Sequence, residues 1–202
     1  SGMINFKLPA YFYITILFIF TVLFAWWSHP QLEPKYSPDS YDYVASAESF
    51  ENASSNLRPF FYPLIIKLCM GLNTDYWPKY LMIVQIVLHS IMIILLYTLY
   101  CQINFSNFTS FLLALGIGLN PSILFYSTYL LPELLLGVLI TLTWFFAYQG
   151  ICQYKNRFRF ILLLVISSFF SGLALMTKPV WLLGILPIII SLIIGRFISK
   201  ID

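Results

Sequence analysis

The stretch YLMIVQIVLHSIMIILLYTLY, residues 80–100, decides the fold class because it is almost wholly apolar and contains no Lys, Arg, Asp or Glu. A helix rises about 1.5 Å per residue, so roughly 20 such residues cross a hydrocarbon core of roughly 30 Å. The strands of a membrane barrel would alternate in polarity, and this stretch does not. The chain as a whole is 60% hydrophobic and 9% charged, far from a soluble domain. The sequence therefore predicts an all-α polytopic integral membrane protein.

Five further apolar stretches of similar length accompany it. The six predicted spans are 9–28, 80–100, 109–131, 132–150, 160–177 and 179–197. The third contains Gly118 and Pro121, and we expect a kink there because proline lacks a backbone donor. Pro132 and Pro179 suit the first turns of the fourth and sixth helices.

The chain reads as one transmembrane module, residues 3–202. Ser1 and Gly2 precede Met3 and are interpreted as an expression scar. The loops alternate between two sides of the membrane. One side holds Lys7, Lys155, Arg157, Arg159, Arg196 and Lys200, and the other holds Lys35, Arg58, Lys67, Lys79 and Lys178. The first group lies in short tails and one short loop, where positive charge marks the cytoplasm. We expect a cytoplasmic amino terminus and an external first loop, 29–79.

This long first external loop holds six of the eight carboxylates of the chain. They are Glu33, Asp39, Asp42, Glu48, Glu51 and Asp75. Two short helices are predicted in the loop, over 40–51 and over 61–72, and the second is apolar but too short to span a bilayer. Both are suited to lie along the membrane surface. Any chemistry of this chain is expected here.

The motif Ser37-Pro38-Asp39-Ser40 opens the first of these helices. Asp39 can accept from the free amides of the first turn, and Asp42 follows three residues later, as in a capping box. A carboxylate held at the membrane surface can also act as a general base or bind a divalent metal cation. Both roles of Asp39 remain open, and Asp42 is a secondary candidate.

The motif Arg58-Pro59-Phe60-Phe61-Tyr62-Pro63 precedes the second short helix. Its prolines favour an extended turn. Arg58 either meets lipid phosphates nonspecifically or holds a bound phosphate or the acidic loop, for which its planar guanidinium is suited. Tyr62 is a second secondary candidate for the site.

Two later charges are expected on the same side of the membrane. Glu133 follows Pro132 in the first turn of the fourth helix, where the helix dipole stabilises a carboxylate. An acidic side chain that borders the bilayer is also energetically costly, and such residues are candidates for a functional role. Lys178 lies between the fifth and sixth spans, where it either snorkels to headgroups or binds a phosphate. Gln85 and His89, one turn apart in the second span, are expected to hydrogen-bond between helices.

Four motifs together resemble the amino-terminal core of a GT-C membrane glycosyltransferase of the protein mannosyltransferase and aminoarabinose transferase type. They are Pro38-Asp39-Ser40, the Arg58 motif, NPSILFYSTYLLPELLLGVLITL (120–142) and GLALMTKP (172–179). Their order and sides of the membrane match the family over nearly the whole chain.

The resemblance implies transfer of a sugar, with inversion, from a polyprenyl-phosphate donor to a glycan, lipid or protein acceptor on the external face, in a bacterial inner membrane. Asp39 matches the acid that activates the acceptor or helps to bind a metal, and Glu133 matches the acid of the second external loop. Lys178 would hold the donor phosphate, and Arg58 is a further match. Membrane lipid and another membrane subunit are implied partners, and nucleic acid is not.

The chain departs from this family in length, because members usually carry more spans and often an external domain. It is therefore expected to be a truncated fragment, a minimal core or one subunit of a complex. A noncatalytic lipid-binding or scaffold subunit is the main alternative. A small transporter or flippase would place ionisable groups along a path through the bilayer, where this chain offers only His89.

Overall fold

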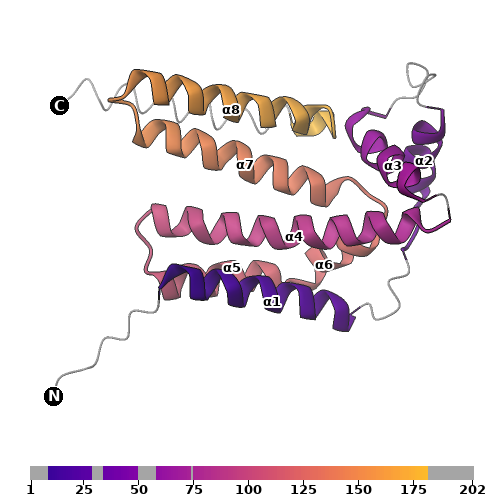
Figure 1. The fold of residues 1–202 in the computed structure, drawn as a ribbon, viewed down its shortest axis with the longest axis horizontal. Coiled ribbons are helices and arrows are strands. Elements are labelled where there is room, and N and C mark those ends of the chain that lie inside the picture. The colour runs from indigo at the N-terminus through magenta and orange to yellow at the C-terminus, as the bar shows by residue number, and fades with distance from the viewer. Residues whose placement is uncertain (1–8, 29–33, 50–57, 74, 182–202) are drawn as a thin grey trace.

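The structure is a computed structural model that describes residues 9–28, 34–49, 58–73 and 75–181 (Figure 1). Every regular element in these ranges is a helix. The elements are α1 (Ala10–Ser28), α2 (Pro38–Glu48), α3 (Phe61–Leu72), α4 (Trp77–Gln102), α5 (Asn107–Gly118), α6 (Pro121–Thr128), α7 (Glu133–Cys152), α8 (Arg157–Leu175) and the short 3₁₀ turn η2 (Pro179–Trp181).

Four of these helices, α1, α4, α7 and α8, are long and apolar enough to cross a membrane. The pair α5 and α6 would make a fifth crossing if it traverses the membrane as one bent span. The predicted sixth span, 179–197, starts with η2 and otherwise lies outside the described residues. The all-helical class is confirmed, with four candidate spans in the described part of the chain.

The break predicted in the third span is confirmed. Helices α5 and α6 meet at a bend of 50°, with Pro121 as the first residue of α6. The Asn120 side chain caps α6 by accepting a hydrogen bond from the backbone of Ser122 at 2.9 Å. Gly118 ends α5 where a Cβ atom would lie 3.2 Å from Thr21 and 3.3 Å from Ile93. The glycine thus lets α5 approach α1 and α4 closely just before the chain bends.

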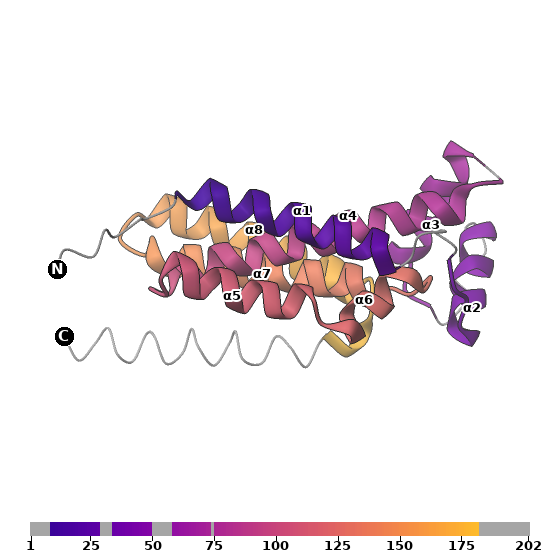
Figure 2. The same cartoon turned by 90° about the horizontal axis from the view of Figure 1, so that it is seen from below.

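The long helices form a bundle in which α4 runs through the middle, with α1 and α5 on one side and α7 and α8 on the other (Figures 1 and 2). Helices α7 and α8 are an antiparallel pair. Phe146 stacks on Phe170 with ring centroids 5.6 Å apart, and Ser167 Oγ donates to the Thr143 carbonyl at 2.8 Å. Between α1 and α4, Thr21 Oγ1 donates a similar hydrogen bond to Ser90 Oγ at 3.0 Å. Such contacts suit helices packed in lipid, where apolar burial alone does not drive association.

Helices α2 and α3 cover one end of the bundle, where α4 and α7 begin and α8 ends (Figure 1). An apolar cluster attaches them to the long helices. Its buried members are Tyr43, Ala47, Tyr62, Ile66, Cys69, Leu81, Leu130, Leu135, Leu139 and Ala174. Tyr43 of α2 meets Tyr62 of α3 edge to face, with ring centroids 5.3 Å apart. Helices α2 and α3 are therefore packed on the end of the bundle.

The predicted helix 40–51 is found at Pro38–Glu48, and the helix predicted over 61–72 has those bounds. Burial of Ser40, Tyr43, Ser46 and Ala47 turns the opposite face of α2 outward. That exposed face carries Asp39 and Asp42, which lie three residues apart and so share one side of the helix.

Candidate functional site

Backbone hydrogen bonds fix both short helices to the bundle. Ahead of α2, the amide of Lys35 donates to the Thr128 carbonyl at 2.8 Å, and the amide of Leu130 donates to the Lys35 carbonyl at 3.1 Å. At the start of α3, the amide of Phe61 donates to the Met176 carbonyl at 3.1 Å. The segment before α2 thus lies beside the linker that precedes α7, and α3 begins beside the end of α8. The segments that carry the four main predicted site residues converge at one end of the bundle.

The start of α2 is capped by serines, and the prediction that Asp39 caps this helix is wrong. Ser37 Oγ accepts from the Ser40 amide at 3.2 Å, and Ser40 Oγ accepts from the Ser37 amide at 2.9 Å, which completes a capping box. Pro38 takes the first helical position, where its missing donor costs nothing, so the cap falls on the residue before it. The Asp39 carboxylate is left free to reach a charged partner.

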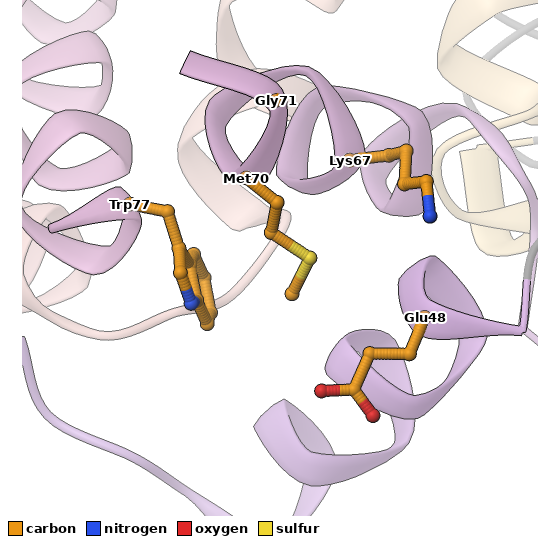
Figure 3. Close-up of a pocket in the computed structure, with 5 residues that line it drawn as sticks. All are labelled: Glu48, Lys67, Met70, Gly71 and Trp77. Atoms are coloured by element: carbon orange, nitrogen blue, oxygen red, sulfur yellow. The ribbon is translucent and has the colours of Figure 1, made fainter. Parts of the chain in front are cut away.

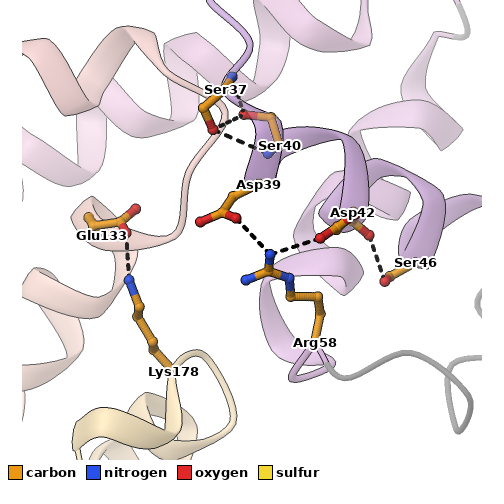
Figure 4. A network of polar contacts seen from close by, with 8 residues as sticks. All are labelled: Ser37, Asp39, Ser40, Asp42, Ser46, Arg58, Glu133 and Lys178. Atoms are coloured by element: carbon orange, nitrogen blue, oxygen red, sulfur yellow. Dashed lines mark hydrogen bonds and ion pairs between the residues drawn. The ribbon is translucent and has the colours of Figure 1, made fainter.

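That partner is Arg58, which binds both exposed carboxylates of α2 (Figure 4). Its Nη2 atom donates to Asp39 Oδ1 at 2.7 Å and to Asp42 Oδ2 at 2.8 Å. The guanidinium also lies over the Tyr43 ring, 5.1 Å from its centroid. The hydrogen bonds that Arg58 donates to Asp42 and to Asp39 raise the pKa of Arg58. Of the alternatives for this arginine, the structure shows the one in which it holds the acidic loop.

Asp39, Asp42 and Arg58 keep hydrogen-bonding atoms that these ion pairs do not use. Two carboxylates and one guanidinium carry a net charge of −1 (−1 −1 +1), and the Asp39 side chain is 60% exposed. Asp39 Oδ2 makes no hydrogen bond to the described residues, and both ion pairs of Arg58 use the same nitrogen. The guanidinium has five N–H donors. Asp39, Asp42 and the Tyr43 side chain take three of them, so donors remain beside the Asp39 carboxylate. The three side chains together offer a carboxylate oxygen that can accept a hydrogen bond, beside N–H groups that can donate one.

The second pair joins α7 to the segment after α8. Lys178 Nζ donates to Glu133 Oε1 at 2.7 Å, with the lysine side chain 38% exposed and the glutamate 27% exposed. Glu133 Oε2 is buried and meets no donor among the described residues. The hydrogen bond that Lys178 donates to Glu133 raises the pKa of Lys178 against the opposing effect of burial, and the charges of Glu133, Tyr43 and Asp39 add to the rise.

The two groups form one site and not two. Figure 4 shows the Asp39 carboxylate between the Glu133–Lys178 pair and the Arg58 guanidinium. The charge of Asp39 acts on the pKa of Lys178, and those of Arg58, Lys178 and Glu133 all act on the pKa of Tyr43. The sequence predicts these four charged residues on the same side of the membrane, and the structure brings them together at the same end of the bundle.

Tyr62, a secondary candidate, is buried beneath this site instead of facing it, with 1% of its surface exposed. Its hydroxyl accepts from Gln85 Nε2 at 3.2 Å, and burial raises its pKa well above the usual value. Gln85 Nε2 also lies 3.0 Å from the Tyr129 carbonyl and 3.1 Å from the Leu131 carbonyl. The amide therefore holds the linker that leads into Glu133.

The predicted hydrogen bonding of Gln85 and His89 between helices is confirmed, because His89 Nε2 lies 3.1 Å from the Gly118 carbonyl. The connection of Gln85 to the site was missed. Its only sequence signal is an amide within an apolar span, and that signal does not say which backbone the amide reaches.

A divalent metal at Asp39 fits the described residues poorly. Within them no group of three or more His, Cys, Asp or Glu side chains is arranged to hold a metal ion. The two carboxylates nearest one another, Asp39 and Asp42, share a guanidinium that already supplies positive charge between them.

Comparison with known proteins finds no family model, no curated protein and no solved structure that matches this chain.

Proposed function

We propose that this chain is the core of a GT-C type glycosyltransferase that moves a sugar from a polyprenyl-phosphate donor to an acceptor hydroxyl. The observation that carries the proposal is the convergence of Asp39, Arg58, Glu133 and Lys178 at one end of an apolar helix bundle. The donor has a lipid tail and a phosphate, so its reacting bond lies at the level where lipid meets water. A carboxylate beside two cations at that level suits such a donor, and the sequence motifs point to the same class.

In the proposed reaction Asp39 Oδ2 takes the proton from the acceptor hydroxyl. The acceptor oxygen bonds to the anomeric carbon from the face opposite the phosphate, and the bond from that carbon to the phosphate oxygen breaks. Polyprenyl phosphate leaves with the bonding electron pair, and the configuration at the sugar inverts. Lys178 and the unused donors of Arg58 stabilise the charge that develops on the phosphate. Glu133 orients Lys178 by its 2.7 Å hydrogen bond.

The topology that goes with this reaction has six spans, with the amino terminus in the cytoplasm and loop 29–79 outside a bacterial inner membrane. Helices α2 and α3 then lie over the external end of the bundle, within reach of an extracytoplasmic acceptor. Lys155, in the turn between α7 and α8, and Arg157 and Arg159, in the first turn of α8, lie at the opposite end of the bundle (Figure 1). That separation agrees with the positive-inside rule. A glycan, lipid or protein acceptor and a further membrane subunit are compatible with this arrangement.

The test supplies the purified full chain, reconstituted with acceptor-containing membranes, with polyprenyl-phosphate sugars labelled in the sugar. Asp39→Asn should lower transfer by about 10²- to 10⁴-fold, the usual loss on removing a general base. Asp75→Asn is the matched control, because Asp75 is another exposed carboxylate of the same loop with no ion pair in the described part of the chain. Lys178→Met should cost roughly 10²- to 10³-fold, as for loss of one donor to a developing charge.

Two outcomes would redirect the proposal. Full transfer by Asp39→Asn would remove the assigned base. Tight donor binding by the wild type without any release of polyprenyl phosphate would favour the noncatalytic lipid-binding subunit. Donor binding is measured separately by equilibrium binding of the labelled donor, so that weak affinity and slow turnover are distinguished.

A further inference from the structure

A second feature lies at the far ends of the two short helices and shares no residue with the site described above. It is an open pocket of about 450 Å³, lined by Glu48, Lys67, Met70, Gly71 and Trp77 (Figure 3). Glu48 ends α2, the next three residues lie in the second half of α3, and Trp77 begins α4. Three separate elements thus build its wall, and its volume falls in the range of small-molecule sites, roughly 300–1,000 Å³.

The pocket holds one anion and one cation that do not neutralise each other. The Lys67 ammonium and the Glu48 carboxylate project toward the same opening, with Met70 and Trp77 as an apolar wall beside them (Figure 3). No ion pair within 4.0 Å joins Lys67 to Glu48, and neither forms one with any other described residue. Opposite charges that face one space without pairing are complementary to a ligand that carries both charges.

The position of the pocket indicates where that ligand comes from. It lies at the start of α4, a candidate span, where Tyr76 and Tyr80 are exposed next to Trp77, as in the aromatic belt of a membrane interface. Leu68 and Leu72 of α3 expose 60% and 75% of their surfaces on the same short helix. Exposed leucines on an amphipathic helix enter the boundary between headgroups and acyl chains. The pocket therefore opens at the level of lipid headgroups.

We propose that this pocket binds the headgroup of a phosphoethanolamine lipid from the surrounding bilayer. Lys67 pairs with the phosphate, and Glu48 accepts hydrogen bonds from the primary ammonium. Met70 and Trp77 contact the carbon atoms between these charges. A choline headgroup has no N–H to give Glu48, and an anionic headgroup without an amine would leave the carboxylate unpaired, so ethanolamine is the preferred class. The proposal does not depend on the sugar-transfer reaction.

The experiment measures lipids retained by the purified full chain in detergent, using native mass spectrometry. The protein is titrated with phosphatidylethanolamine, phosphatidylcholine or phosphatidylglycerol of equal chain length. The wild type should retain the ethanolamine lipid at least about tenfold more tightly than the other two, since only this headgroup offers Glu48 a charged N–H donor and Lys67 a phosphate. Glu48→Gln should lose the preference for ethanolamine over choline, and Lys67→Gln should weaken both by roughly tenfold or more.

Matched controls come from the same loop. Lys79→Gln and Asp75→Asn each remove an exposed charge that does not line the pocket, and they should retain lipid like the wild type. Lys67→Arg keeps the positive charge and should keep the lipid, which separates loss of the cation from misfolding. Equal retention of all three lipids, or equal losses in the pocket and control variants, would overturn the proposal. If water-soluble glycerophosphoethanolamine bound as tightly as the lipid, the proposal that the ligand comes from the bilayer would be overturned.

Discussion

Replacement of Gln85 by Met should loosen the connection between the bundle and the candidate site. Gln85 Nε2 has two hydrogens and lies within 3.2 Å of three acceptors, the Tyr62 hydroxyl and the carbonyls of Tyr129 and Leu131. At most two of these hydrogen bonds can be made at full strength. Methionine fills a similar volume, so the change removes hydrogen bonds without opening a large cavity.

The magnitude follows from those contacts. Hydrogen bonds between membrane helices contribute about 0.6 kcal/mol on average, and an acceptor left buried without a donor costs about 1–3 kcal/mol. We expect Gln85→Met to lower the free energy of unfolding by about 1–3 kcal/mol. For a chain of this size each kcal/mol shifts the unfolding temperature by about 2–4 °C, which gives a fall of roughly 2–12 °C.

The assay uses a thiol as a local reporter. Cys69 is only 4% exposed and belongs to the same apolar cluster as Tyr62 and Leu130. In a background in which Cys101 and Cys152 are serine, a thiol-reactive dye reports when this cluster opens on heating. In the Gln85→Met variant, the temperature at which Cys69 becomes labelled should fall together with the temperature of global unfolding.

Gln149→Met is the control, because Gln149 is a half-buried glutamine of α7 with no side-chain hydrogen bond to the described residues. It should unfold within about 0.5 kcal/mol of the parent. A Gln85→Met variant as stable as this control, with Cys69 equally protected, would refute the assigned role of the amide. The double variant with Tyr62→Phe should show a coupling energy of about 0.5–1 kcal/mol if the 3.2 Å contact is a hydrogen bond.

Two further predictions concern the ends of α2 and α8. Ser37→Ala should cost about 1 kcal/mol of unfolding free energy by removing the helix cap, measured by thermal unfolding against Ser49→Ala, whose hydroxyl bonds only a carbonyl of its own helix. Stability contributed by the raised pKa of Lys178 should be complete below pH 10.5 and lost as the pH rises through the folded-state value. Lys178→Met should therefore show a smaller fall in unfolding temperature than the wild type between about pH 8 and about pH 11; an unchanged fall would exclude that contribution.

Local pattern was sufficient for the helices and for the break between α5 and α6. Apolar length predicted the four candidate spans found in the described residues. Pro121 predicted the bend because proline lacks a backbone donor at that position. The four charged site residues could be named because the predicted topology assigns them all to the same side of the membrane.

Their partners could not be predicted, because pairing depends on contacts between segments distant in sequence. Capping was one of the two roles left open for Asp39, because it lies near a helix start, yet Ser37 is the residue that caps α2. Tyr62 belongs to a charged motif, but its helix turns it inward to Gln85. Helical spacing says which residues share a face and not what that face meets.

The hydrogen bonds that attach α2 and α3 also set an order of assembly during synthesis. Both helices leave the ribosome before the carbonyls and amides that hold them, those of Thr128, Leu130 and Met176, have been made. The segments that carry Glu133 and Lys178 are also made after α2. A chain that ends before Lys178 therefore cannot bring all four charged residues together.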